Sequence, residues 1–199
     1  MSSGVYPGSF NPPTVAHLAI ARAAVEQCGL TRLDLVLSRD ALGKDDRDLV
    51  AIEDRLVVLL EVAASRPWLH ARIADERLIA DLAVGYDVVV LGADKWAQVV
   101  DPRWYGDDPD ARDDVVRRLP TVACAPRPGH PVPDAGVALV IDDDHGEVSA
   151  TAARQGEVGW MLPEAQAFAE RTGAWLDPER YRAARHSRPA PTGAAGADR

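Results

Sequence analysis

Residues 8–17, with the sequence GSFNPPTVAH, combine residue types that suit an anion site. Gly8 lets a ligand approach the backbone closely. The two prolines favour an extended chain, so that Thr14 can cap a helix that follows. His17 then takes the third helical position, where unpaired N–H groups and the helix dipole favour an anion. The segment predicts a phosphate site; the alternative is a plain strand-to-helix turn with a partly buried His17.

A second segment, residues 148–154 with the sequence VSATAAR, also opens a predicted helix. Either Ser149 or Thr151 can cap that helix through its hydroxyl. Arg154 can present its planar guanidinium to phosphate oxygens. The segment predicts a second phosphate contact, the alternative being an ordinary capped surface helix with a solvated arginine.

Between them, residues 88–96 read VVVLGADKW, an apolar strand that ends in glycine and a carboxylate. Gly92 and Asp94 would lie at the carboxyl end of that strand, where a carboxylate can accept hydrogen bonds from ribose hydroxyls. Alternatively, Asp94 caps the next helix.

Lysine and arginine after the second predicted strand are further candidates for phosphate contacts. Lys44 is the first of them. Arg47 and Arg55 are weaker candidates, because a charge beside several aspartates is usually a solvated pair.

Aromatic residues follow the Gly-Ala-Asp segment, and at least one of them is expected to stack on a planar ring. The candidates are Trp96, Trp104 and Tyr105, each of which is also typical of a core or loop anchor.

Short aliphatic runs alternate with helical patterns along the chain, and several runs are apolar throughout, as in strands covered on both faces. Strands are predicted at residues 4–6, 33–38, 69–73, 87–91, 121–125 and 137–141. Helical spacing predicts helices at 15–27 and 49–65. The pattern is typical of an α/β protein with a doubly wound, Rossmann-like parallel sheet flanked by helices, whose ligands bind beyond the carboxyl ends of the strands.

Composition limits the remaining organisation. One domain is expected at residues 1–186 and a disordered tail, rich in Pro, Ala and Gly, at 187–199. Residues 101–114, rich in Asp and Pro, are expected to form a long loop near the crevice.

Charge and hydropathy exclude several classes of protein. The net charge of -9 argues against an extended nucleic-acid surface. The apolar stretches are too short to cross a membrane, and the start has no charged leader, so a cytoplasmic protein is expected. Cys28 and Cys124 lack metal-ligand spacing and are expected to be buried structural thiols.

Taken together, the motifs resemble a known family. The string GSFNPPTxxHL resembles the (H/T)xGH signature of the nucleotidyltransferase superfamily, and within it the nicotinamide and nicotinate mononucleotide adenylyltransferases. Residues 148–154 resemble the second signature, ISSTxxR, and residues 92–94 resemble the Gly-Ala-Asp element of the nucleotide site. Ala16 departs from the usual Gly, and Ala150 from one of the usual Ser residues.

The resemblance implies a soluble enzyme that joins a pyridine mononucleotide to AMP from ATP, with Mg²⁺ and release of pyrophosphate, and that can form a homo-oligomer. It implies catalytic roles for His17, Lys44 and Arg154. The implied ATP contacts are Gly8, Ser9, Phe10, Thr14, His17, Gly92, Asp94, Ser149, Thr151 and Arg154, and the implied contacts to the mononucleotide are Asn11, Lys44, Trp96 and Trp104.

Three other functions stay open on the sequence. A phosphopantetheine adenylyltransferase shares the Thr-x-x-His pattern, and a cytidylyltransferase shares the fold. A nucleotide-binding protein without turnover would share the site, with Ala16 and Ala150 as the departures to suspect.

Overall fold

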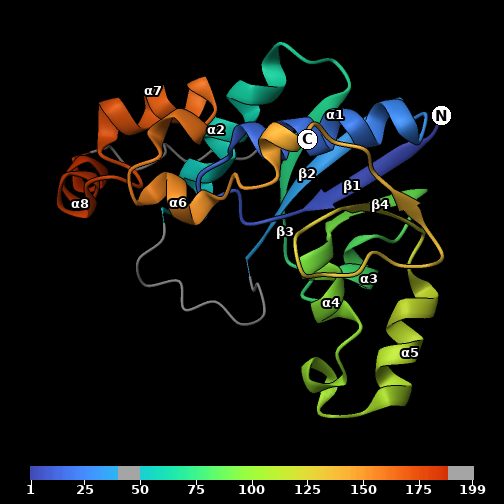
Figure 1. Ribbon diagram of the computed structural model, residues 1–199. Coiled ribbons are helices and arrows are strands. Elements are labelled where there is room, and N and C mark those ends of the chain that lie inside the picture. The colour runs from blue at the N-terminus through green and yellow to red at the C-terminus, as the bar shows by residue number, and fades with distance from the viewer. Residues whose placement is uncertain (40–49, 188–199) are drawn as a thin grey trace, which may run out of the picture.

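The computed structural model describes residues 1–39 and 50–187, and a parallel sheet forms the centre of this part (Figure 1). Its strands are β1 (Ser3–Pro7), β2 (Arg32–Ser38), β3 (Leu69–Ala74), β4 (Val88–Gly92), β5 (Thr121–Ala125) and β6 (Val137–Ala138). They run in the order β3-β2-β1-β4-β5-β6, and every neighbouring pair is parallel. The predicted doubly wound fold is confirmed, and its strand order reverses between β1 and β4, where such folds bind ligands.

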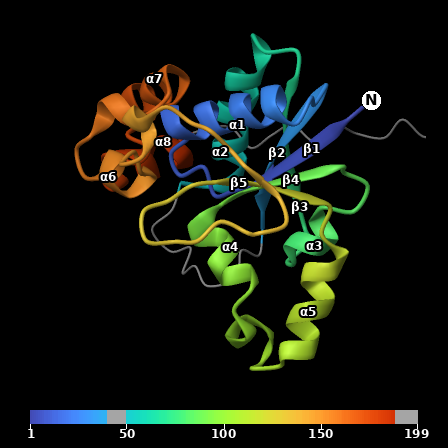
Figure 2. The same cartoon turned by 45° about the vertical axis from the view of Figure 1, so that its right-hand side comes forward.

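Helices cover both faces of the sheet. α1 (Val15–Gln27) and α2 (Ile52–Ala64) pack on one face, and α3 (Ile79–Leu82), α4 (Ala93–Val99) and α5 (Pro109–Arg118) pack on the other (Figure 2). The strands supply both layers because successive side chains point to opposite faces. In β4, Val88 and Val90 pack towards α1, while Val89 and Leu91 pack towards α4.

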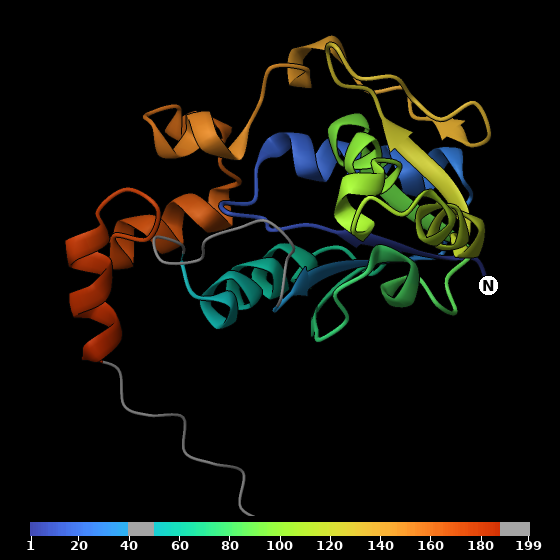
Figure 3. The same cartoon turned by 90° about the horizontal axis from the view of Figure 1, so that it is seen from below.

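The C-terminal helices form a separate group at one end of the domain (Figure 3). The group contains α6 (Ala150–Arg154), α7 (Pro163–Thr172) and α8 (Pro178–His186). Phe168, Trp175 and Tyr181 bury their side chains with Val58 on the outer side of α2. The segment before α7 also contacts the start of α1, where the Leu162 N–H donates to the Pro13 carbonyl at 3.1 Å.

Residues 101–114 are not the long loop that the sequence predicts. They contain the short 3-10 helix η2 (Pro102–Tyr105) and the start of α5. Both helices begin at an Asp-Pro pair, in which the carboxylate accepts from backbone N–H groups and the proline takes the first helical position. The composition that suggested a loop is here the signal for two helix starts.

Other predicted boundaries are nearly right. The helix predicted at 15–27 is confirmed, and the one predicted at 49–65 spans Ile52–Ala64, with residue 49 outside the described part. The strand predicted at 137–141 is only Val137–Ala138. The ladder with β5 ends there because residue 126, just after β5, is a proline and has no N–H to donate. The Gln27 side chain instead bonds the N–H and the C=O of Val140, at 3.0 and 2.8 Å.

The remaining predictions at this level concern the tail and the membrane. Residues 188–199 of the predicted tail lie outside the described residues, so the division into a domain and a tail stays a prediction. Within the described chain, none of the helices has the length and apolar character needed to cross a membrane.

One buried carboxylate joins β2 to the turn before β4. Asp34 is 2% exposed and accepts hydrogen bonds from Arg32 Nε at 2.7 Å, Arg32 Nη2 at 3.0 Å and the Tyr86 hydroxyl at 2.6 Å. Burial raises the pKa of Asp34, but the hydrogen bonds from Arg32 and Tyr86 outweigh it and hold the pKa below its usual value. The ionised carboxylate is therefore part of the folded structure.

We expect Asp34→Asn to lower the free energy of unfolding by about 1–3 kcal/mol at neutral pH, because buried donors then lose a charged acceptor. The lowered pKa of Asp34 means that its contribution is present above about pH 4 and is lost as the pH falls through the folded-state pKa. Urea denaturation of both proteins across this range should show the difference shrinking in acid. Asp75→Asn, at a side chain 90% exposed, is the control and should change stability by under about 0.5 kcal/mol; equal effects of the two variants would contradict the prediction.

Candidate active site

The segment after β1 turns sharply because a phenylalanine packs beneath it. Phe10 has a φ of 41° and a fully buried ring, whose centroid lies 5.4 Å from that of Tyr6. A Cβ on Gly8 would lie 2.9 Å from two carbons of this ring. Only glycine leaves room for the ring, so the predicted need for Gly8 has a packing cause in addition to ligand approach.

The start of α1 is built as predicted. Thr14 is the N-cap, and His17 is the third helical residue. The Thr14 N–H donates to His17 Nδ1 at 3.0 Å, and the Thr14 hydroxyl lies 2.7 Å from the same nitrogen. Because Nδ1 accepts from a backbone N–H, a neutral His17 ring carries its proton on Nε2. Ala16, between them, is buried at 2% exposure.

The second segment reaches the first across the fold. Ser149 caps α6 by accepting from the Ala152 N–H at 3.1 Å, as one of the two predicted caps. Arg154, on α6, donates to the carbonyl of Asn11 and, through Nη2, to the Thr151 hydroxyl at 3.3 Å. The structure thus brings both predicted phosphate segments together.

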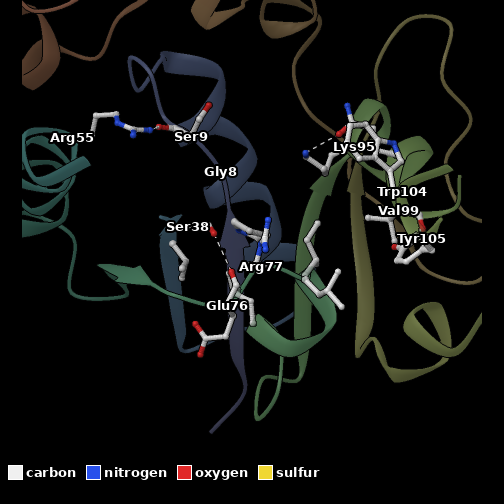
Figure 4. A pocket seen from close by; sticks show the side chains of 16 residues that line it. Gly8, Ser9, Ser38, Arg55, Glu76, Arg77, Lys95, Val99, Trp104 and Tyr105 are labelled. Atoms are coloured by element: carbon white, nitrogen blue, oxygen red, sulfur yellow. Dashed lines mark hydrogen bonds between the residues drawn. The ribbon is translucent and has the colours of Figure 1, made fainter. Parts of the chain in front are cut away.

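A cavity of about 140 Å³ lies beside this loop, beyond the carboxyl ends of β1 and β2 (Figure 4). Its walls are formed by the loop after β1, by the segment that leads into α3, and by the two helices α4 and η2. The polar and aromatic residues that line it are Ser9, Ser38, Arg55, Glu76, Arg77, Lys95, Gln98, Trp104 and Tyr105. The cavity therefore occupies the crevice at which the strand order reverses.

Most of the charged residues in the cavity wall are basic. Arg55 is 7% exposed and donates to the Ser9 carbonyl at 2.8 Å, so the expectation of a solvated pair was wrong for this residue. Lys95 donates to Gln98 Oε1 at 2.8 Å. Burial lowers the pKa of Lys95, and Asp94 raises it in part. Arg77 completes the cations, while the Glu76 carboxylate points away from Arg77 (Figure 4).

The aromatic candidates divide between the core and the cavity. Trp104 lines the cavity and is 41% exposed, and Tyr105 beside it is fixed by donating to the Val99 carbonyl at 2.9 Å. Trp96 packs instead against the core between the sheet and α4. Of the two tryptophans predicted to contact substrate, Trp104 lies in the cavity wall, where a substrate ring can stack on it.

The Gly-Ala-Asp element forms the junction of β4 and α4. Gly92 is the N-cap of α4, and among the described residues no side chain caps this helix, so Asp94 does not have the alternative role that the sequence left open. The Asp94 side chain is exposed, and its Oδ1 lies 2.5 Å from where a Cβ on Gly92 would be. The carboxylate therefore lies against the end of the strand.

Of the predicted contacts in the described chain, Gly8, Ser9 and Trp104 line the cavity, and the others do not. Lys44 and the weaker candidate Arg47 lie outside the described residues. Asn11 is 3% exposed, and its Oδ1 accepts from the Trp175 indole at 2.7 Å. Its role in binding substrate stays a prediction.

Sequence reasoning missed several polar residues of the cavity. Ser38, Arg77 and Lys95 each lie within a few residues of the end of a strand, which is the signal that could have found them. Arg127, just after β5, was also missed; its guanidinium donates to the carbonyls of Gly146 and Val148 at 3.3 and 3.4 Å, beside the second segment.

The cysteines have no part in this site. Cys124 is fully buried, and burial, with a further contribution from Asp94, raises its pKa to about 11, which makes the thiolate scarce. Cys28 is only partly buried, contrary to expectation, because it follows α1 at the surface.

Known proteins resemble this chain in sequence. A family model described as cytidylyltransferase-like matches residues 5–156. A probable nicotinate-nucleotide adenylyltransferase of Anaeromyxobacter sp. (strain K) is 33% identical over 175 residues, covering 79% of this chain and 87% of that protein. One of the same description from Salinibacter ruber (strain DSM 13855 / M31) is 26% identical over 196 residues, covering 92% and 94%.

The family match includes the loop after β1, the β4–α4 junction and α6, the three elements that carry the predicted motifs. The chain is therefore a nucleotidyltransferase that belongs to the cytidylyltransferase-like family.

Proposed function

We propose that this enzyme transfers the adenylyl group of ATP to nicotinate mononucleotide and releases pyrophosphate. The observation that carries the proposal is the cavity beside Gly8 and Ser9, which combines Trp104 with the cations Arg55, Arg77 and Lys95. A pyridine ring can stack on Trp104, and the cations suit an acceptor that is anionic at both its phosphate and its ring carboxylate. The relatives named above carry the same activity in their descriptions.

The reaction needs no covalent intermediate on the protein. A phosphate oxygen of the mononucleotide attacks the α-phosphorus of ATP, a new P–O bond forms, and the bond to the oxygen that bridges the α- and β-phosphates breaks. Pyrophosphate leaves with that electron pair. The protein aligns the two phosphates and stabilises the negative charge that develops between them.

His17 and Arg154 are the described residues that serve this purpose. The Thr14 hydrogen bond to Nδ1 leaves the His17 Nε2 proton as the ring's donor to phosphate. Arg154 supplies a guanidinium beside the same loop. Lys44 is proposed as a third cation on the strength of the family resemblance.

The donor set fits Mg²⁺ that arrives with ATP. No group of three or more His, Cys, Asp or Glu side chains in the described ranges could hold a metal ion, and Mg²⁺ usually binds through substrate phosphates and water with one or two carboxylates. The exposed Asp94 at the β4–α4 junction is the carboxylate that we propose would hold it. Bound there, Mg²⁺ would neutralise phosphate charge during transfer.

We expect ATP and nicotinate mononucleotide to give pyrophosphate in a Mg²⁺-dependent reaction, measured by a coupled pyrophosphate assay. Nicotinamide mononucleotide should react with a kcat/KM about fivefold lower, because a charge-assisted hydrogen bond to the ring carboxylate is about 1 kcal/mol stronger than a neutral one. Assays with phosphopantetheine and with CTP complete the panel. Activity with phosphopantetheine alone would contradict the proposal, and ATP binding without any transfer would indicate a binding protein.

His17→Ala should lower kcat by about 10²-fold, the usual effect of removing one preorganised donor to a transition-state charge. The affinity for ATP, measured by calorimetry, should change much less, because the loop backbone and α6 contact the nucleotide in both states. His70→Ala, at an exposed histidine of β3, is the matched control and should behave as wild type. Turnover at the wild-type rate in His17→Ala would remove this residue from the mechanism.

Lys95→Gln should reduce the preference for nicotinate over nicotinamide mononucleotide about fivefold, because it exchanges a charged donor for a neutral one. Since burial lowers the pKa of Lys95, the preference of the wild type should also decline with rising pH before an exposed lysine titrates, at about pH 10.4. The measurement is the ratio of kcat/KM for the two substrates. Arg103→Gln, next to Trp104 but exposed and paired with Asp101, should leave the ratio unchanged; an unchanged ratio in Lys95→Gln would exclude that side chain from ring recognition.

A further inference from the structure

A buried tryptophan of the C-terminal group bonds directly to the loop after β1. Trp175 donates its indole N–H to Asn11 Oδ1 at 2.7 Å, and the two residues are 8% and 3% exposed. We propose that Trp175 is a positioning residue for adenylyl transfer, which holds the loop of residues 8–14 in its reactive conformation through Asn11. The proposal rests on the transferase function given above.

The bond fixes more than one atom of Asn11. An indole nitrogen only donates, so the Asn11 amide must turn its oxygen towards Trp175 and its NH₂ group the opposite way. The Asn11 carbonyl accepts from Arg154. Side chain and backbone of Asn11 are thus held by two different donors, and the peptide between Phe10 and Pro12 keeps one orientation.

Trp175 is itself held in an unusual conformation. Its φ is 66°, a left-handed value that is rare for a bulky residue and that persists only where the surroundings enforce it. Its ring packs against Phe168, with centroids 5.9 Å apart. The preceding turn is tied by Thr172, which donates to the Phe168 carbonyl at 2.7 Å and accepts from the Ala174 N–H at 3.2 Å. The unfavourable backbone conformation of Trp175 is explained if its indole must reach Asn11.

The segment just before α7 supports the loop at a second point. The Leu162 N–H donates to the Pro13 carbonyl at 3.1 Å, and Met161 forms a bridge with Thr14, the cap of α1. Trp175 and the Met161–Leu162 segment therefore hold the loop from Asn11 to Thr14, the cap of the helix that carries His17. A loss at Asn11 would move the groups that face the phosphates.

The first test is Trp175→Phe, which removes the N–H and keeps an aromatic ring. We expect kcat with ATP and nicotinate mononucleotide to fall about tenfold, with the KM for ATP within about twofold, because small displacements of aligned groups act on the transition state. Trp160→Phe makes the same chemical change at a tryptophan that packs on the same cluster and whose indole, in the described part of the chain, donates no hydrogen bond. It should keep the wild-type kcat. Equal kcat values in the two variants would overturn the proposal.

A double variant tests whether Trp175 acts through Asn11. If it does, Asn11→Ala combined with Trp175→Phe should be no slower than Asn11→Ala alone, whereas multiplied losses would show independent roles and overturn the proposal. Should Trp175→Phe fail to fold, Asn11→Ala breaks the same bond without touching the C-terminal core. A wild-type kcat in Asn11→Ala would then overturn the proposal.

A readout without turnover separates this inference from the proposed function. Amide hydrogen exchange of the peptide that covers residues 8–14 should be faster in Trp175→Phe than in wild type and Trp160→Phe, since the loop opens more often. Faster exchange in an enzyme that transfers nothing to any acceptor would support the positioning contact and refute the function. Unchanged exchange would refute the contact whatever the activity.

Discussion

Three backbone carbonyls of the short loop after β1 organise this site. The carbonyls of Ser9, Asn11 and Pro13 accept hydrogen bonds from Arg55, Arg154 and the Leu162 N–H, which come from α2, α6 and the start of α7. The loop after β1 is therefore shaped by elements that fold far from it in sequence.

The arrangement explains how an acidic protein binds anions. The net charge is -9, yet the cavity wall carries Arg55, Arg77 and Lys95. Arg55 is nearly buried and contacts the loop backbone, so its charge is less screened than that of a surface residue. A local cluster of this kind suits small phosphorylated substrates, and the charge on the rest of the surface opposes extended polyanions.

The C-terminal helices close the site from the other side. α6 carries the second signature, and α7 and α8 bury their apolar residues against α2. Tyr181 of α8 donates to the buried Asp54 of α2 at 2.6 Å and accepts from the Ala51 N–H at 2.9 Å, next to Arg55. The same helix α2 therefore packs against the C-terminal group and carries Arg55, which donates to the loop.

The sequence by itself determined the features that depend on local chemistry. Alternating apolar runs predicted the strands and the parallel sheet, and the Pro-Pro-Thr string predicted where α1 begins and where His17 lies on it. The Asp-Pro pairs that begin at residues 101 and 108 are local signals of helix starts as well. The composition of this stretch, rich in Asp and Pro, suggested a loop instead. Tertiary structure decided which charges and rings meet. Arg55, Lys95 and Trp104 share a cavity because two crossovers, β2 to β3 and β4 to β5, begin at one edge of the sheet. Trp175 meets Asn11 across 164 residues. Spacing along the chain carries no information about such contacts, because they arise only when the buried faces of separate elements pack together.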